Sequence, residues 1–465
     1  EQEEIADRMK KQVDNATNLI TSLSGERSRW IEDSKKFEQN KMELLGNAAI
    51  CSAFIAYSGP FNFEFRSLLI KDFFKGEIER RGLPYSRDLD IESFLADEAT
   101  KGEWAMNKLP SDTISVQNGI LVTSSSRFPL LIDPQNQAKT WLLTTFPEME
   151  TNKLIFSQKY IAAKFDYLDP ILANGEQIIV EGIENEVESK LEPILEKQIL
   201  PSASKIKKLM VGDKTKDFCE TFKMYLLCKL INPHFSPELA AKTTIIDFNV
   251  TISGLEQQLQ GIVVSKEQKI LEETLKNIMA DITKNKNSLV QCQKDILDNL
   301  NKPGNLLENA EIIVVLNNSK IRSEENNKKI KEAEEKKEDI NLKRLKYLPV
   351  ATRGSVLYFS IVDIQEISKM YSTSLQQFTD LFEYSIANAI PNNHTETRVK
   401  NIVQKLSDMV YKYVNRGLFE RDKTAFILIV CFKILTVERI EGNTLLNQGD
   451  INLFIKCGGI IMPDK

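Results

Sequence analysis

The residues with the clearest chemical signature lie between Asp133 and Thr140, in the segment DPQNQAKT. This segment follows the apolar run FPLLI and leads into a helical pattern. A phosphate-binding loop has the pattern GxxxxGK[ST], in which the glycines let the backbone wind around the phosphates while the Lys and the hydroxyl reach phosphate and Mg²⁺. Lys139 and Thr140 match this pattern, whereas Asp133 and Ala138 stand where the two glycines belong. The spacing therefore predicts a degenerate phosphate loop.

The two replacements have different physical consequences. The Cβ of Ala138 would occupy space where the backbone must approach a phosphate closely. An inward-pointing Asp133 would repel a polyanion, because two unit charges 4 Å apart interact with about 4 kcal/mol at an effective dielectric constant near 20. That repulsion from several phosphate charges would outweigh the attraction of Lys139. The carboxylate could instead turn outward or cap the next helix, and the sequence leaves these orientations open.

A second motif of nucleotide-hydrolysing sites is also altered. Such sites end an apolar strand with an acidic pair, in which one residue holds Mg²⁺ and the other polarises the attacking water. In the run QIIVEGIENE, Glu181 takes the metal position and Gly182 takes the water-activating position. Glycine cannot accept a proton, and Glu184 and Glu186 lie beyond the expected strand.

The two altered motifs together predict a module without catalytic residues, bound cofactor or metal. The alternative is that Lys139, Thr140 and Glu181 still bind ATP for a regulatory purpose. The chain has only two histidines, His234 and His394, so no nucleophile–histidine arrangement is legible.

The segments before and after this loop, which must hold it in place, have the sequence pattern of an α/β domain. Continuous apolar runs without alternation are typical of strands buried on both faces, and helical segments between them suit crossover connections. The sequence therefore predicts a doubly wound parallel sheet of five strands, carried by the runs FPLLI (128–132), LIFS (154–157), QIIV (177–180), FKMYLLC (222–228) and TTIIDFNV (243–250).

Two further stretches carry apolar residues at alternating steps of three and four, the 3.5-residue period of a coiled coil. The first is a seam of Ile5, Met9, Gln12, Ala16, Leu19 and Leu23, which could also be the core face of a bundle helix. The second is a seam of Leu271, Leu275, Ile278, Ile282, Leu289 and Ile296, followed by a turn at Pro303 and Gly304 and a charged helical tract. A short turn between long helices makes them antiparallel neighbours, so we predict a projecting hairpin over about 266–347.

Between these stretches, the aromatic cluster AFIAYSGPFNFEF (53–65) contains Gly59 and Pro60, and we expect a packed loop between helices there.

Composition excludes several classes of protein. Of the 465 residues, 42% are hydrophobic and 27% charged, and the net charge is −5, which gives no basic excess for binding nucleic acid.

Six scattered cysteines without a CxxC pair make a structural zinc site improbable and indicate a reducing compartment. The longest apolar run, AFILIVCF (425–432), is much shorter than a membrane span. The chain opens at Glu1 inside a helical pattern, and we expect a segment of a longer protein.

The chain carries a collinear series of motifs: GERSRW (25–30), FIAYSGPFNFEFR (54–66), LPSDTISVQNGI (109–120), RFPLLIDPQNQAKTWL (127–142), LINPHFSPE (230–238), TISGLEQQL (251–259), GNLLENAEII (304–313), RGSVLYFSIVDI (353–364) and LFERDKTAF (418–426). Together they resemble the motifs of dynein heavy chains, and the variants NPHFSPE and SVQNG are closer to axonemal than to cytoplasmic members.

The resemblance implies a domain order from the end of the stalk through the fifth AAA+ module of the motor ring. Residues 1–28 would be the ring-proximal end of the second stalk helix, 29–85 the helical stalk base and small subdomain of the preceding module, and 86–252 the large α/β subdomain of the fifth. Residues 253–440 would be its small helical subdomain, including the 266–347 hairpin as the buttress, and 441–465 the connection toward the sixth module. The family usually has another residue at the position of Thr140, so this Lys-Thr pair is a departure.

The resemblance also implies a function. The parent chain would be a microtubule motor of the cytoplasm, cytoskeleton and ciliary axoneme, with ATP and Mg²⁺ in other modules. Its partners would be the first stalk helix, neighbouring modules, intermediate and light chains and microtubules, with no nucleic acid and no membrane. Together with the two seams, this predicts a non-catalytic module that transmits conformational change between ring and stalk. The alternatives are a regulatory ATP-binding module and a scaffold with a coiled-coil docking arm.

Overall fold

The computed structural model describes residues 34–200, 207–211, 214–230, 233–300, 310–365, 367–371, 373–392, 394–437, 439–440 and 443–444, together with residues 13, 17 and 31. These residues fall into two compact units, which are described separately. The first comprises 1–109, 113–248 and 276–338, and the second comprises 110–112, 249–275 and 339–465. The predicted seam from Ile5 to Leu23 and the predicted turn at Pro303 and Gly304 lie outside the described residues.

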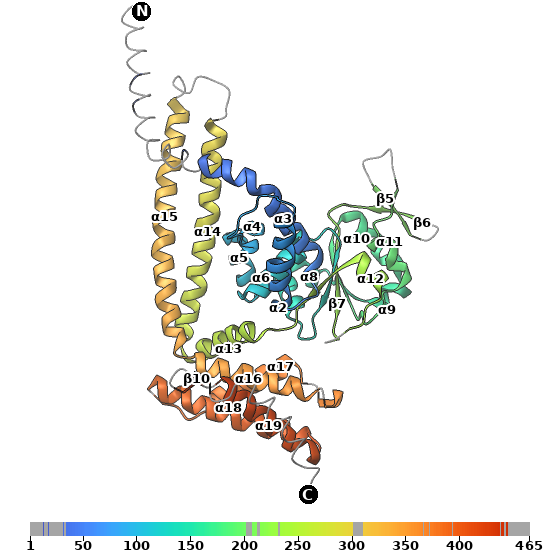
Figure 1. The fold of residues 1–465 in the computed structure, drawn as a ribbon, viewed down its shortest axis with the longest axis vertical. Coiled ribbons are helices and arrows are strands. Elements are labelled where there is room, and N and C mark those ends of the chain that lie inside the picture. The colour runs from blue at the N-terminus through green and yellow to red at the C-terminus, as the bar shows by residue number, and fades with distance from the viewer. Residues whose placement is uncertain are drawn as a thin grey trace, which may run out of the picture. The chain divides into compact units, whose positions relative to one another are not determined.

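The first unit contains a five-stranded parallel sheet in the order β2-β3-β7-β1-β8, which confirms the predicted fold class. Figure 1 labels its central strand, β7. Each β1 residue is buried, as expected for a strand covered on both faces. In register, Leu130 of β1 lies between Leu226 of β7 and Ile245 of β8. The strands are β1 (Phe128–Ile132), β2 (Ile155–Ser157), β3 (Gln177–Glu181), β7 (Lys223–Cys228) and β8 (Thr243–Asp247).

Helices before and between these strands complete the first unit, together with a helix at residues 34–57. They are α2 (Phe63–Leu68), the π-helix η1 (Leu69–Phe74), α3 (Lys75–Arg80), α4 (Ile91–Leu95), α5 (Glu98–Met106), α6 (Thr113–Ser124), α7 (Gln137–Thr145), α8 (Glu148–Thr151), α9 (Gln158–Ala163), α10 (Leu168–Asn174), α11 (Glu192–Leu195) and α12 (Pro237–Lys242), with short 3₁₀ turns η2 (Phe165–Tyr167) and η3 (Ser189–Leu191). Residues of the first helix, such as Phe54, share one hydrophobic core with the sheet.

The sequence interpretation missed a small antiparallel sheet formed by β4 (Ile199–Leu200), β5 (Lys207–Val211) and β6 (Lys214–Phe218). Leu209 and Phe218 are buried in the main core, while the neighbouring Lys208 is exposed. The strand sequences KKLMV and KTKDF do not alternate between apolar and polar residues, so neither carried the period-two signal of a strand.

The expectation of a packed aromatic loop is largely wrong. Helix α2 begins at Phe63, and the side chains of Tyr57, Phe61, Phe63 and Phe65 are all exposed. The buried residues of the segment are Phe54, at the end of the first helix, and Ser58 and Gly59 in the short loop that follows it. A Cβ on Gly59 would lie 2.1 Å from the carbonyl oxygen of Ile245 in β8, so only glycine permits this close approach.

A buried arginine fixes this loop to the sheet. Arg66 is 1% exposed, and its guanidinium donates to the carbonyl oxygens of Phe61 (2.7 Å) and Gly59 (2.9 Å) and to Asn118 Oδ1 (2.7 Å). Asn118 in turn donates through Nδ2 to the carbonyl oxygen of Asp247, at 2.7 Å. Burial lowers the pKa of Arg66 to about 10, opposed by the nearby Asp247 charge. The positively charged guanidinium of Arg66, with carbonyl and amide oxygens as its acceptors, therefore connects the loop before α2 to α6. Through Asn118 it is also connected to β8.

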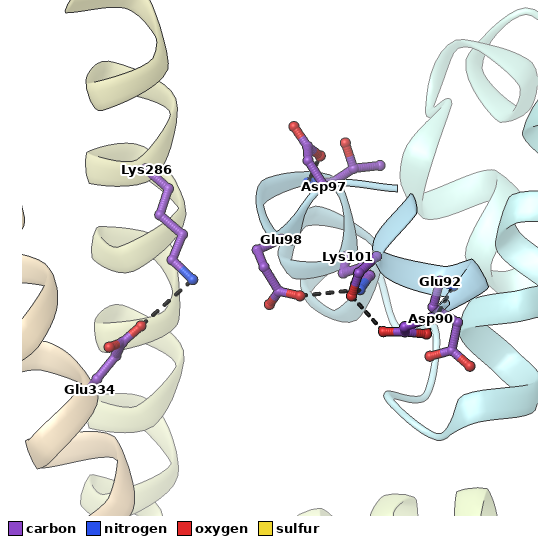
Figure 2. Close-up of polar contacts among 9 residues, drawn as sticks. Asp90, Glu92, Asp97, Glu98, Lys101, Lys286 and Glu334 are labelled. Carbon is purple, nitrogen blue, oxygen red and sulfur yellow. Dashed lines mark hydrogen bonds and ion pairs between the residues drawn. The ribbon is translucent and has the colours of Figure 1, made fainter. Parts of the chain in front are cut away.

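Long helices form the predicted hairpin. Its arms are α14 (Lys269–Leu300) and α15 (Ala310–Leu345). Figure 2 shows Lys286 of α14 directed toward Glu334 of α15, with Nζ and Oε1 3.6 Å apart, and Asn326 Nδ2 also donates to Ser288 Oγ at 3.0 Å. Of the predicted seam, Leu275 and Ile282 are buried and Leu271, Ile278 and Leu289 are half-buried, whereas the side chain of Ile296 lies outside the description.

The first arm is seated on α5 within the first unit. A Cβ on Gly102 would lie 2.7 Å from Thr283 Oγ1, so the two helices approach at a position where any side chain would intrude. One turn further, Asn287 Nδ2 donates to Glu103 Oε1 at 3.3 Å. Beside this contact, Lys101 pairs with Glu98 at 3.1 Å (Figure 2).

The second unit is helical. Buried residues of α18 recur at steps of three and four, from Val399 to Val414, and pack against α16 and α17 around the buried Phe382. Arg398 pairs with Glu267 at 2.7 Å across α18 and α13. The elements are α13 (Ile252–Glu267), α16 (Leu348–Ile364), η4 (Lys369–Tyr371), α17 (Leu375–Ala387), α18 (Thr395–Gly417), α19 (Glu420–Val437), β9 (Arg439–Ile440) and β10 (Asn443–Thr444). Among the helices in the described part of the chain, none combines the length and the apolar composition that crossing a bilayer requires.

Replacing Arg66 should destabilise the first unit strongly. In Arg66→Met, buried acceptors lose their donor, which should reduce the free energy of unfolding by about 3 kcal/mol. Urea titration followed by the fluorescence of the buried Trp104 and Trp141 would measure this change. The matched control is Arg80→Met, because Arg80 is exposed and should change stability by less than about 0.5 kcal/mol. Equal midpoints for the two variants would contradict the assigned role.

Candidate functional site

The candidate site lies at the carboxyl edge of the sheet, where β1 leads into α7. Asp133 directly follows β1, and Glu181 is the last residue of β3. Strand β7 lies between these two strands, so the loop and the acidic motif occupy neighbouring positions along one edge. The structure thus brings together Asp133, Ala138, Lys139, Thr140 and Glu181, the groups that the sequence analysis selected.

The Asp133 carboxylate points inward and is only 2% exposed. Oδ1 accepts the backbone N–H of Gln137 at 2.7 Å, and Oδ2 accepts that of Lys139 at 2.9 Å. Both donors belong to the first turn of α7, where N–H groups have no partner within the helix. In a phosphate loop these donors would face the bound anion. Here the carboxylate of Asp133, the first residue of the loop, accepts hydrogen bonds from two of these N–H groups. Of the orientations that the sequence left open, the side chain thus adopts the one that caps the next helix.

The environment of this carboxylate perturbs its acidity. Burial raises the pKa of Asp133 to about 6, although hydrogen bonds from the Lys139, Gln137 and Ala138 backbone and the nearby Lys229 charge pull it downward. Desolvation therefore exceeds the stabilisation that the helix end provides. At neutral pH the group is still mostly an anion held in the backbone cradle.

The loop backbone reaches this geometry through a residue other than glycine. Asn136 has φ of 58° and ψ of 28°, in the left-handed region that asparagine tolerates better than most residues. Its carbonyl oxygen accepts the backbone N–H of Thr140 at 3.0 Å and the Thr140 hydroxyl at 2.7 Å. The hydroxyl that would contact Mg²⁺ is therefore bound to the chain's own backbone. The Asn at position 136 was an available signal for this conformation that the sequence interpretation did not use.

The two remaining charged groups pair with each other. Lys139 Nζ lies 2.8 Å from Glu181 Oε1, and both side chains are about a quarter exposed. Gly182 follows with φ of 81°, a conformation that side chains rarely adopt. Sequence spacing selected Lys139 and Glu181 as separate ligands of phosphate and metal but could not show that they would neutralise each other.

Ala138 is fully buried, with a side chain that is part of the main core beside Trp141. A phosphate could approach the first turn of α7 only after the Asp133 carboxylate left the cradle. It would also have to compete with Glu181 for Lys139. The arrangement as it stands is an intramolecular anion site, filled by a carboxylate. Across the described residues, no group of three His, Cys, Asp or Glu side chains is placed to hold a metal ion.

Comparison with known proteins gives two family matches. Residues 102–326 match the model described as the ATP-binding dynein motor region, and residues 1–78 match the model described as the microtubule-binding stalk of dynein motor. The first match contains the loop, the acidic motif and most of the hairpin.

Individual relatives agree with these matches. The chain is 39% identical over 432 residues to mouse dynein axonemal heavy chain 5, which covers 93% of this chain and 9% of the relative. It is 38% identical to the flagellar outer-arm dynein gamma chain of Chlamydomonas reinhardtii and to human dynein axonemal heavy chain 8, covering 96% of this chain and 10% of the relative in each case. The chain thus spans about a tenth of the length of these relatives.

The raised pKa of Asp133 predicts how stability depends on pH. Between pH 4 and 6 an unfolded chain releases this proton while the folded chain retains it, so the free energy of unfolding should fall as pH rises. At 1.36 kcal/mol per pKa unit the decrease is about 3 kcal/mol, and it should level off above pH 6.

The measurement is urea unfolding at several pH values for the wild-type chain and for Asp133→Asn, which cannot ionise. The difference between their free energies isolates this carboxylate, because other groups titrate in both proteins. Parallel curves for the two proteins between pH 4 and 6 would refute the assignment.

Proposed function

The chain belongs to the dynein heavy chain family, and on that premise we propose that it is a force-transmitting segment of a microtubule motor whose own nucleotide site does not turn over ATP. The observation that carries this proposal is the Asp133 carboxylate in the cradle where a phosphate would bind. A phosphate bound there would have to displace the Asp133 carboxylate, which belongs to the same chain and is therefore always present at the site.

The acidic motif supports the same proposal. Gly182 stands at the water-activating position and cannot act as a base. Glu181, at the metal position, is neutralised by Lys139. Each group that hydrolysis needs is thus either missing or bound to another group of this chain.

The hairpin supplies a mechanical element. Its arms are 32 and 36 residues long in the described part, which corresponds to about 50 Å at 1.5 Å per residue. Because α14 touches α5 at Gly102, displacement of α5 would move the hairpin with it. A stiff lever seated on the sheet domain can bias a two-state neighbour such as a sliding stalk helix.

The cellular setting of the parent follows from the family. We expect a cytoskeletal location, in the axoneme of a cilium or flagellum, with microtubules, neighbouring modules and the other dynein chains as partners. ATP and Mg²⁺ would act in other modules of the parent chain.

Two other functions compete with this proposal. The family model that matches residues 102–326 is described as ATP-binding, and Lys139, Thr140 and Glu181 retain groups for a Mg·ATP site. A regulatory ATP-binding module is therefore the second candidate. A scaffold that uses the hairpin as a docking arm is the third, and it would leave ring and stalk uncoupled from the hairpin.

Nucleotide titration separates the first two candidates. We expect no saturable binding of a fluorescent ATP analogue with Mg²⁺ below about 1 mM for the wild-type chain. The double variant Asp133→Gly with Ala138→Gly should bind more tightly, because it removes a repulsion of about 4 kcal/mol per charge pair and opens the cradle.

The control adds Lys139→Ala to the double variant, which should abolish the gained binding. Micromolar binding by the wild-type chain that is lost in Lys139→Ala would contradict the proposal and favour the regulatory module.

Loosening the hairpin seat tests the mechanical part in the parent motor. In Gly102→Ala the new Cβ meets Thr283 Oγ1, and overpacking of this kind costs about 1–3 kcal/mol. We expect the ratio of microtubule affinities between nucleotide states to fall several-fold. Adding Thr283→Ala should restore it, because the next atom of Thr283, its Cβ, would lie 3.8 Å away.

The matched control is Gly76→Ala in α3. Among the described residues no heavy atom lies within 4 Å of a Cβ built there, so this variant gains the same helix propensity without a clash. Unchanged coupling in Gly102→Ala, or an equal loss in Gly76→Ala, would count against the lever and leave the scaffold reading.

A further inference from the structure

A groove of about 710 Å³ lies in the second unit and is lined by residues of α16, α18 and α19. Within their described residues, α18 and α19 each pack against α16 but do not pack closely against each other. The short segment 418–419 joins the two helices, and the lining residues Val399 and Val437 each lie about 26 Å along their helix from it. The helices therefore diverge from their common turn, and the groove lies between their far ends.

The groove combines apolar walls with positive charge. Its charged lining residues, Arg353 and Lys400, are both cationic, and none of the described residues that line it is acidic. Arg353 Nη1 donates to Ser407 Oγ at 3.2 Å, which holds the guanidinium beside α18, and Lys400 is exposed. The aliphatic residues of the walls come from all three helices and are Leu348, Val356, Val399, Val403, Ile434 and Val437.

We propose that this groove binds an amphipathic helix of a partner protein, with aliphatic residues on one face and acidic residues beside them. Helices pack with their axes 8–10 Å apart, so a helix laid between α18 and α19 would contact both of them and α16. The four helices would then form a small bundle around the aliphatic residues. An extended peptide fits less well, because the groove offers no strand edge to pair with its backbone N–H and C=O groups.

The dimensions and the charge of the groove define the partner further. On α18 the lining residues Val399, Val403 and Ser407 recur at every fourth position and span about 12 Å, which corresponds to about two turns of a bound helix. Two turns present aliphatic residues at positions i, i+3 or i+4, and i+7. Acidic residues beside them would face Arg353 and Lys400, and this complementarity selects an acidic helix over a basic one.

Peptide binding to the parent heavy chain tests this assignment by fluorescence anisotropy. The probe is a fluorescein-labelled helical peptide of about 15 residues, with Leu at every third or fourth position and Glu beside each Leu. The comparison peptide has Lys in place of Glu. We expect the Glu peptide to bind in the micromolar range and the Lys peptide to bind at least about tenfold more weakly.

Reversing one rim charge should reverse part of this preference. In Lys400→Glu the Glu peptide should bind about fivefold more weakly and the Lys peptide more tightly. The matched control is Arg416→Glu, which changes an exposed charge at the other end of α18 and should leave the binding of both peptides unchanged.

A charge placed in the apolar wall provides a second test. Val437→Asp should weaken binding of the Glu peptide at least about tenfold, because the bound helix would bury the new carboxylate. The matched control is Leu428→Asp, since Leu428 and Val437 are both 43% exposed but lie about 180° apart around α19. Circular dichroism of both variants should match the wild-type chain, because both positions are exposed.

Several outcomes would overturn the proposal. They are the absence of saturable binding of the Glu peptide to the parent heavy chain, equal affinities for the two peptides, and equal weakening by Val437→Asp and Leu428→Asp. Self-association of the heavy chain that Val437→Asp abolishes would assign the groove to a second copy and would overturn it as well.

Discussion

The hydrogen bonds from the first turn of α7 to the Asp133 carboxylate are the constraint on which the candidate site depends. A helix start leaves N–H groups that must find an acceptor, and in a buried position water cannot supply it. The carboxylate meets this need from within the loop. Once these donors are occupied, Lys139 has no anion to hold in the cradle and pairs with Glu181. The arrangement of these side chains at the carboxyl edge of the sheet thus depends on Asp133, the residue directly after β1.

A second buried charge serves the rest of the first unit. Arg66 joins the loop before α2 to α6 and, through Asn118, to the end of β8. A guanidinium presents several donors in a fixed plane, so it can bind acceptors from separate segments at once. Its desolvation is unfavourable, and the hydrogen bonds to the carbonyl oxygens of Phe61 and Gly59 and to Asn118 offset part of that cost. Helical and sheet segments of this unit therefore share a hydrophobic core and are also joined by the hydrogen bonds of Arg66 and Asn118.

The sequence predicted the parts of the fold that periodicity encodes. The central strands β3, β7 and β1 match their apolar runs because burial on both faces demands continuous apolar residues, and FPLLI coincides with β1. The edge strands β2 and β8 also coincide with predicted runs, although they are only partly buried. Periodicity also predicted the first hairpin arm, whereas the second arm was predicted from the turn signal and the charged helical tract after it. It could not decide the orientation of Asp133, since one carboxylate can serve as helix cap or as solvent-facing side chain. It also failed at residues 57–65, where aromatic residues suggested packing but are exposed, because the burial there belongs to Gly59 and Arg66.

The carboxylate in the cradle also bears on the evolutionary history of this loop. Replacing Asp133 alone by glycine would leave buried N–H groups without an acceptor, and replacing Ala138 alone would weaken the core while the carboxylate stayed in place. Each single substitution toward a phosphate loop should thus lower the stability of the fold before a bound ligand could compensate for it. The two substitutions would have to occur together for the cradle to open, which is the pattern called sign epistasis.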